Sequence, residues 1–203
     1  MTSYFSDDTI KRTIEFHGHQ CPGLAIGIRA AELCLRELGH HDDSPIVAIC
    51  ETDMCGVDAI QFLTGCSVGK GNLILKDHGK MAFTFYRRKD GKGFRAMLNP
   101  DFIGGLRAEM GRLMGVVFEG NPTPEEEEKC KEVRAECEKE YYAADLADMF
   151  LKQEPQIRMP RPASILQSLV CEDCGEAHME SRSRRFAGQT LCLTCFEKVE
   201  QKI

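Results

Sequence analysis

The sequence lacks any long apolar run, and its first residues lack the pattern of an export signal. No window of the 203 residues approaches the ~18 uninterrupted apolar residues that a membrane span needs. The opening stretch, MTSYFSDDTIKRT, has no basic segment followed by an apolar one. These absences predict a cytoplasmic protein with no membrane association.

An excess of basic residues is also missing. The 26 Lys and Arg are outnumbered by 32 Asp and Glu, which gives a formal net charge of −6. A broad nucleic-acid-binding surface would normally show as a basic excess, so nucleic acid is not an expected partner. With 42% hydrophobic and 29% charged residues and no internal repeat, the composition is typical of an ordinary globular protein.

Cysteine, by contrast, is abundant. The chain has 11 cysteines, an odd number, in a sequence without an export pattern. A disulfide framework would favour an even number in a secreted chain. We therefore expect reduced thiols, several of them bound to metal.

Local patterns predict an α+β fold, with helices packed on a small, mostly antiparallel sheet. Ser6, Gly18, Pro22 and a Thr123-to-Glu126 capping box mark helix boundaries. The expected helices are 7–17, 22–38, 56–64, 101–114 and 124–151, and the expected strands are 45–50, 73–75, 81–87 and 94–98. We expect a core domain over residues 1–153, a proline-containing linker over 154–164 and a zinc ribbon over 165–203.

The C-terminal cysteines carry the strongest signal. Cys171 and Cys174 form one CxxC pair, Cys192 and Cys195 form another, and 17 residues separate the pairs. Four thiolates in this spacing predict a tetrahedral zinc site that stabilises a module too small to fold on its own core. The short basic patch at 182–185 is better explained as a solvated hairpin tip than as a phosphate contact. Such ribbons also dock protein partners.

A second group of ligands lies near the N-terminus. His17, His19 and Cys21 fall in the turn between two predicted helices, and Cys55 falls at the start of a third. If the two segments meet, these four side chains suit zinc or another divalent metal, and Asp58 would orient a histidine or act as a base. The alternative, in which the histidines satisfy helix carbonyls and the cysteines pack in the core, stays open from spacing alone.

The glycine-rich stretch TGCSVGKGN, residues 64–72, does not fit a phosphate-binding loop. The Walker pattern needs four residues between its first glycine and the Gly-Lys pair, whereas Gly65 and Gly69 enclose three, and Gly71 stands where Ser or Thr is required. A loop that lets the backbone approach a ligand or another subunit fits better.

Together, FHGHQCPGLAIG, CGVDAIQFLTGCSVGKGNL and the two CxxC pairs resemble the E-subunit family of formylmethanofuran dehydrogenase, over a core of about residues 12–115. Ser67 stands where the family more often has threonine. The resemblance implies an α+β core that forms an intertwined dimer, with the motif residues around one cleft. It therefore favours a core metal site on His17, His19, Cys21 and Cys55. No pterin motif or ferredoxin-type cysteine run is present, so the chain is not expected to be a catalytic subunit by itself.

Two functions remain open at this stage. The first is a metal- and thiolate-dependent enzyme or redox accessory in anaerobic one-carbon metabolism, with Cys55 or Cys21 as thiolate and Asp58 as base. The second is a zinc-stabilised homodimer that docks on or regulates a protein partner through the ribbon. Delivery of metal or sulfur to a partner enzyme is a third option. The residues favour the first, because His and Cys clustered at helix starts exceed what docking requires.

Overall fold

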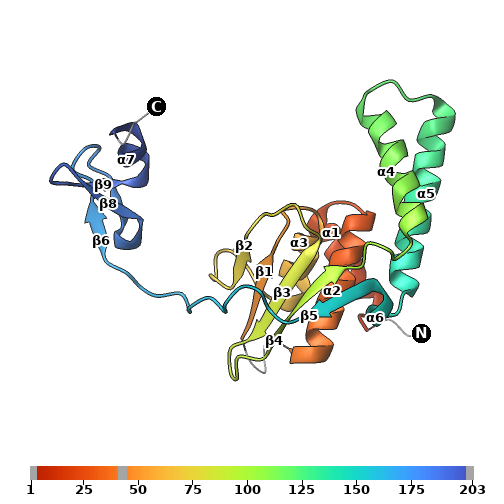
Figure 1. Cartoon of the computed structure of the whole chain (residues 1–203), viewed down its shortest axis with the longest axis horizontal. Helices are drawn as coiled ribbons and strands as arrows, with labels where there is room; N and C mark the ends of the chain where they lie inside the picture. Colours follow the sequence, from red (N-terminus) through yellow and green to blue (C-terminus); the bar gives the residue numbers. More distant parts are fainter. Residues whose placement is uncertain (1–3, 41–44, 200–203) are drawn as a thin grey trace. The chain divides into compact units, whose positions relative to one another are not determined.

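A computed structural model describes residues 4–40 and 45–199 (Figure 1). The chain divides into two compact units, residues 1–162 and residues 163–203. Each unit is described by itself below. No helix among the described residues is long and apolar enough to cross a bilayer.

The first unit is built on a five-stranded mixed sheet. Its strands are β1 (Ile46–Cys50), β2 (Leu73–Leu75), β3 (Ala82–Arg87), β4 (Gly93–Leu98) and β5 (Phe150–Gln153), in the order β2-β1-β3-β4-β5. β1 and β2 are parallel, and the other three pairs are antiparallel. The predicted α+β class with a mostly antiparallel sheet is therefore confirmed.

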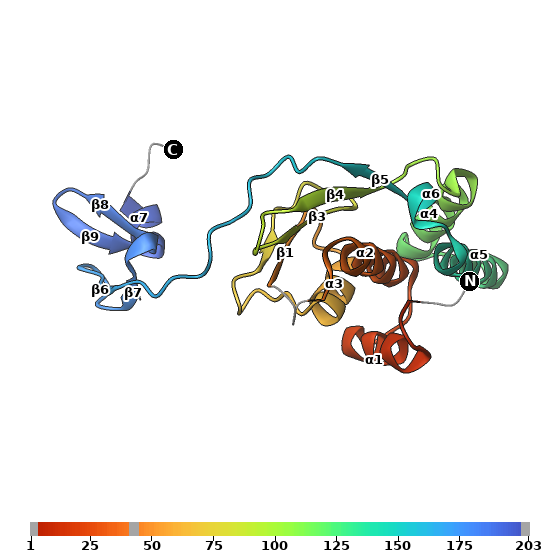
Figure 2. The ribbon, with the colours of Figure 1, turned by 90° about the horizontal axis from the view of Figure 1, so that it is seen from below.

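Three helices pack on one face of this sheet: α1 (Asp7–His17), α2 (Pro22–Leu38) and α3 (Gly56–Thr64) (Figure 2). Their bounds agree with the predicted ones, because each helix starts and stops on a local signal. Ser6 accepts a hydrogen bond from the Thr9 amide, and Gly18 and Gly65 end their helices in the left-handed conformation. α2 is the central helix, since 14 of its 17 residues are buried.

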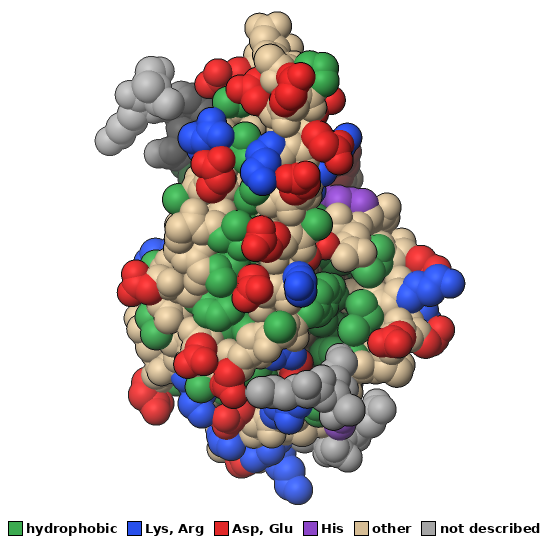
Figure 3. All heavy atoms as spheres, turned by 90° about the vertical axis from the view of Figure 1, so that its right-hand side faces the viewer, with side chains coloured by type: hydrophobic (Ala, Val, Ile, Leu, Met, Phe, Trp, Pro, Cys, Tyr) green, Lys and Arg blue, Asp and Glu red, His purple; other side chains and the backbone are tan. Residues whose placement is uncertain are grey.

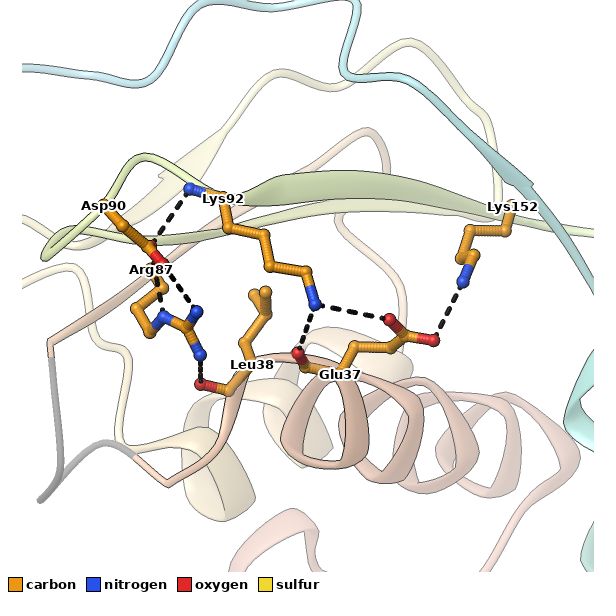
Figure 4. A network of polar contacts seen from close by, with 6 residues as sticks. All are labelled: Glu37, Leu38, Arg87, Asp90, Lys92 and Lys152. Carbon is orange, nitrogen blue, oxygen red and sulfur yellow. Dashed lines mark hydrogen bonds and ion pairs between the residues drawn. The ribbon is translucent and has the colours of Figure 1, made fainter.

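The C-terminal end of α2 is held by basic side chains (Figure 4). Arg87 and Lys92, which flank the β3–β4 turn, donate to the carbonyls of Leu38 and Glu37 at 2.9 and 3.0 Å. Cations at this end satisfy free carbonyls and oppose the negative end of the helix dipole. The Glu37 carboxylate also accepts from Lys152 of β5 at 2.8 Å, so the helix end is tied to two separate parts of the sheet.

A helical hairpin projects from the same unit (Figure 1). It consists of α4 (Gly104–Phe118) and α5 (Pro124–Ala143), and the predicted capping box of Thr123 and Glu126 begins α5. Cys130 and Cys137 are buried, as expected of small apolar residues.

The predicted helix over 124–151 is wrong at its C-terminal end. The backbone leaves the helix at Ala144, where ψ is 146°. Asp145 then caps the short helix α6 (Leu146–Met149) through the Ala147 amide, and residues 150–153 pair with β4 as an edge strand. The side chains of this segment carry no alternating pattern, so only the available edge of β4 decides its structure.

The predicted linker makes specific contacts with the face of the sheet opposite the helices. Ile157 and Met159 pack against the buried side chains of Val47, Ile49 and Tyr86. The Tyr86 hydroxyl donates to the Ile157 carbonyl at 2.5 Å. We call residues 154–161 the strap, and Figure 2 shows it leaving β5 on this side of the sheet.

The second unit is small and rich in turns. It contains β6 (Ser168–Val170) paired with β7 (Ala177–Met179), the single-turn η1 (Glu180–Arg182), β8 (Ser183–Phe186) paired with β9 (Gln189–Cys192), and α7 (Leu193–Val199). Its buried hydrophobic cluster is Cys171, Leu191 and Cys195. Two cysteines in so small a core indicate that metal binding supplies stability that packing does not.

Candidate metal centres

The four C-terminal cysteines converge on one point in the second unit. Cys171 follows β6, Cys192 ends β9, and Cys195 lies in the first turn of α7. Their sulfur atoms and that of Cys174 all lie within 4.8 Å of one another. The set offers four soft ligands and matches the closed, tetrahedral arrangement of a structural zinc site.

Backbone amides prepare this second-unit site for thiolates. The amide of Cys192 donates to Cys171 Sγ at 3.3 Å, and the amide of Cys195 donates to Cys192 Sγ at 3.4 Å. Donation from the Cys192 and Cys174 amides lowers the pKa of Cys171 to about 6. The anionic form, which is the one that binds zinc, is therefore favoured at this position.

The N-terminal candidates also converge. One ligand atom from each of His17, His19, Cys21 and Cys55 lies within 4.8 Å of the others. We call these four residues the core cluster. His17 ends α1, His19 and Cys21 lie in the following turn, and Cys55 immediately precedes α3. The structure thus brings together two segments that are 34 residues apart, counted from Cys21 to Cys55.

Asp58 orients His17 within the core cluster. Its Oδ2 lies 2.7 Å from His17 Nδ1, so the carboxylate accepts from that nitrogen and leaves Nε2 free to bind a metal. Nε2 in turn lies 3.8 Å from Cys21 Sγ. Tetrahedral zinc with ordinary Zn–N and Zn–S bonds would place such a pair about 3.6 Å apart. The donor set and this spacing fit a zinc-class divalent ion.

The thiol of Cys21 needs a positive charge to ionise. Burial raises its pKa to about 11, and the nearby Cys55 acts in the same direction. Leu24, Ile28 and Ala59 surround it with apolar atoms. A cation is the natural compensation for two thiolates in such a place, because burying unpaired charge is costly. His19 is exposed and Cys55 is half-buried, so the core cluster opens to solvent on their side.

Three glycines that the sequence analysis did not single out make this convergence possible. A Cβ built on Gly27 would lie 2.3 Å from the Gly56 carbonyl oxygen, and one on Gly23 would lie 3.2 Å from Cys55 Cβ. Helices α2 and α3 therefore touch backbone to backbone near their N-termini, which carry Cys21 and Cys55. The Gly23-Leu-Ala-Ile-Gly27 spacing was the available signal, since small residues four apart allow helices to approach closely.

Helix α5 supplies two further residues that spacing did not reveal. Gln20 Nε2 donates to Glu138 Oε2 at 2.7 Å, and Tyr142 packs against the apolar group around Cys21. Glu138 and Tyr142 lie more than 100 positions from His17, His19 and Cys21 along the chain. No local pattern near residue 20 indicates them.

The other candidates of the region have structural partners. Glu51 forms a buried ion pair with Arg95, whose Nε lies 2.6 Å from Oε1. In the loop over 65–72, Lys70 Nζ donates to the Gly65 carbonyl, and the Ser67 amide donates to Asn72 Oδ1. The loop therefore uses these donors internally instead of presenting them to a phosphate.

Comparison with known proteins decides the family. The family model described as FmdE, molybdenum formylmethanofuran dehydrogenase operon, matches residues 16–151, which include the whole core cluster. The chain belongs to the FmdE family. A second model, the prokaryotic dksA/traR C4-type zinc finger, matches residues 164–201 of this FmdE protein.

Two relatives of this FmdE protein are informative. A crystal structure of an FmdE-like protein of tungsten formylmethanofuran dehydrogenase from Syntrophus aciditrophicus matches with a TM-score of 0.63 and 24% identity, covering 99% of this chain and 100% of that one, and shows the shared fold. A protein of Archaeoglobus fulgidus, described as a probable S-adenosyl-L-methionine-binding protein, is 32% identical over 200 residues. The match covers 91% of this chain but 51% of that protein, so the chain spans about half the length of this relative.

Proposed function

We propose that the core cluster binds a divalent metal, zinc or a similar ion, and that Cys55 and Asp58 make it a metal- and thiolate-dependent centre in anaerobic one-carbon metabolism. The chain would act there as an enzyme or as a redox accessory. The observation that carries this proposal is the convergence of four ligand atoms within 4.8 Å around a histidine that a carboxylate orients. Packing alone requires neither a carboxylate-oriented histidine nor an exposed one.

The residues of the centre would divide the work by their surroundings. Asp58 holds the His17 ring and its tautomer, and Cys21 is fixed because its Sγ accepts from the Leu24 amide at 3.4 Å. Cys55 is half-buried and can reach a ligand from solvent. A bound divalent metal would stabilise the thiolates and polarise a ligand at a free position. Asp58 is 45% exposed in its side chain, so a proton that it accepts can pass to solvent.

Metal analysis of the full chain tests the proposal. We expect two metal ions per chain in the wild type and one in Cys55→Ser, with the remaining ion held by the C-terminal cysteines. Cys171→Ser should also reduce the content, this time by loss of the second-unit ion. Cys130→Ala, a buried cysteine outside both sites, is the matched control and should keep two ions. A wild-type content of one ion that Cys55→Ser leaves unchanged would refute the core metal centre.

The Archaeoglobus relative suggests one ligand to test. S-adenosyl-L-methionine is a one-carbon donor, so binding by this chain would fit the proposed role, although the relative is about twice as long. Titration calorimetry of the metal-loaded wild type against Cys55→Ser would show whether binding depends on the core cluster. Equal affinity in the two proteins would separate the ligand from the metal centre.

A second candidate function is docking of a protein partner through the C4 zinc finger. The second unit exposes apolar side chains, among them Val170 at 63% and Met179 at 49%. Because residues 163–203 form a compact unit, their deletion should abolish partner capture and leave the core metal in place. Capture that survives the deletion would argue against docking through this unit.

We also propose that the chain is a homodimer assembled through the α4–α5 hairpin. Phe118 is 79% exposed, and Leu106, Met110 and Val117 are only partly buried. Figure 3 shows hydrophobic side chains among acidic ones on this face of the molecule. Phe118→Asp should lower the mass measured by light scattering to that of one chain, whereas the neighbouring Glu119→Lys should not. A monomeric wild type would refute the proposal.

A further inference from the structure

The four residues of the core cluster are not held equally well. Asp58 fixes His17, the Leu24 amide and burial fix Cys21, and close packing against Gly23 fixes Cys55. His19 differs, because within residues 4–40 and 45–199 its ring makes no hydrogen bond or ion pair and stacks only near the His17 ring, with centroids 4.5 Å apart. It is also the most exposed member. The backbone of its turn therefore decides where His19 lies.

That turn has one side-chain anchor to a distant element. It begins at Gly18, whose φ of 91° places it in the left-handed region, and its next residues are His19 and Gln20. Gln20 lies between His19 and Cys21, and its amide donates to Glu138 of α5 at 2.7 Å. A hydrogen bond from an amide to a carboxylate is among the stronger ones, since the acceptor is charged. Glu138 thus restrains the residue next to the least restrained ligand.

The anchoring helix is itself attached to the site. Tyr142, one turn beyond Glu138, packs against the same apolar group as Cys55 does, namely Cys21, Leu24, Ile28 and Ala59. α5 is also half of the projecting hairpin. Any displacement of α5 would therefore move the partner of Gln20 relative to the ends of α1 and α2.

We propose that Glu138 is a positioning residue that acts through Gln20 to keep His19 on the core metal. With the contact formed, the metal has four protein ligands; with the contact broken, His19 withdraws and one position becomes free for an external ligand. This inference rests on the proposed core metal centre and states how that centre would be opened. It also makes the α4–α5 hairpin the element through which a partner would control the opening.

Cobalt substitution of the full chain tests this step without an activity assay. Co²⁺ in a four-coordinate site with thiolates absorbs strongly in the visible range, and the band weakens when a ligand is replaced by water. Subtraction of the Cys55→Ser spectrum removes the contribution of the C-terminal site. We expect Glu138→Ala and Gln20→Ala to shift the difference spectrum toward that of His19→Ala, and to speed removal of the core metal by a chelator by about 10–100-fold.

Two further variants separate the hydrogen bond from charge and from general loosening. Glu138→Gln keeps an acceptor oxygen and should restore most of the wild-type spectrum. Glu136→Ala removes the same charge from an exposed position on the same helix and should change nothing. The double variant Gln20→Ala/Glu138→Ala should behave like either single one, because both remove one interaction.

The outcomes distinguish this inference from the proposed function. If the wild type shows no difference spectrum against Cys55→Ser, the core metal centre itself is refuted. If that difference is present but Glu138→Ala matches Glu136→Ala in spectrum and chelation rate, the centre stands and the positioning role of Glu138 is overturned. A Glu138→Ala spectrum unlike that of His19→Ala would also overturn it.

Discussion

Substitution of Gly27 by alanine tests the backbone contact on which the core cluster depends. The new Cβ would lie 2.3 Å from the Gly56 carbonyl oxygen and 2.5 Å from its Cα, whereas ordinary contact begins at 3.4 Å. Helices α2 and α3 must therefore separate locally by about 1 Å, since neither atom belongs to a flexible side chain. Metal ligand distances tolerate only about 0.2 Å, so Cys21 and Cys55 would no longer fit one ion.

The energetic sign of this substitution is informative. Alanine normally stabilises a helix interior by about 1 kcal/mol relative to glycine. Overpacking costs about 1–3 kcal/mol, and here it acts against rigid backbone, so we expect a net loss of stability. For a unit of this size, the melting temperature should fall by roughly 2–10 °C. Gly105→Ala, on α4 with no atom within 4 Å, is the control and should not lower it.

Differential scanning calorimetry and metal analysis together complete the test. We expect Gly27→Ala to lose the core metal and to keep the ion of the C-terminal cysteines. A variant that melts at or above the wild-type temperature and still holds two ions would refute the argument that backbone contact between α2 and α3 positions the cluster.

Three individual contacts can be tested in the same way. Asp58→Asn should leave the fold intact and weaken core metal binding by about 10–100-fold, measured by competition with a chelator, because the amide no longer fixes the tautomer of His17. Hydrogen bonding to Arg95 lowers the pKa of Glu51 below its ordinary value of 4.5, so the ion pair stabilises the protein above that pH and the stability is lost as the pH falls. Glu51→Gln should therefore be less stable than the wild type at pH 7, and the difference between their melting temperatures, measured by calorimetry, should shrink below about pH 4. Tyr86→Phe removes the hydrogen bond to the strap and should cost about 1 kcal/mol. Limited proteolysis should then cut the strap faster, and an unchanged rate would mean that apolar packing alone retains it.

The helices and strands near strong local signals could be predicted from the sequence. The bounds of α1, α2 and α3 follow from Ser6, Gly18 and Pro22 and from apolar spacing, all within a few residues of each boundary. The end of α5 and strand β5 could not be predicted, because such a segment becomes a strand only where a neighbouring edge is free to pair. α4 was placed three residues too early at its start and four too early at its end for a related reason, since its glycines weaken the local pattern.

The two metal centres contrast in the same way. The C-terminal site is local: two CxxC pairs fix two ligands each, and a short hairpin-containing module brings them together. The core cluster is not local, and spacing around His17, His19, Cys21 and Cys55 left a packing explanation open. The family resemblance, which covers both segments, was needed to favour the metal site.

The sequence by itself determined the composition of both ligand sets, the helix starts that carry Cys21 and Cys55, and the thiol-rich, acidic character of the chain. Tertiary structure decided that His17 meets Asp58, that glycine contacts bring two helix starts together, and that Glu138 reaches Gln20 from α5. The physical reason is distance along the chain. Caps, turns and CxxC pairs act within a few residues, whereas these contacts depend on how whole helices pack on a shared sheet.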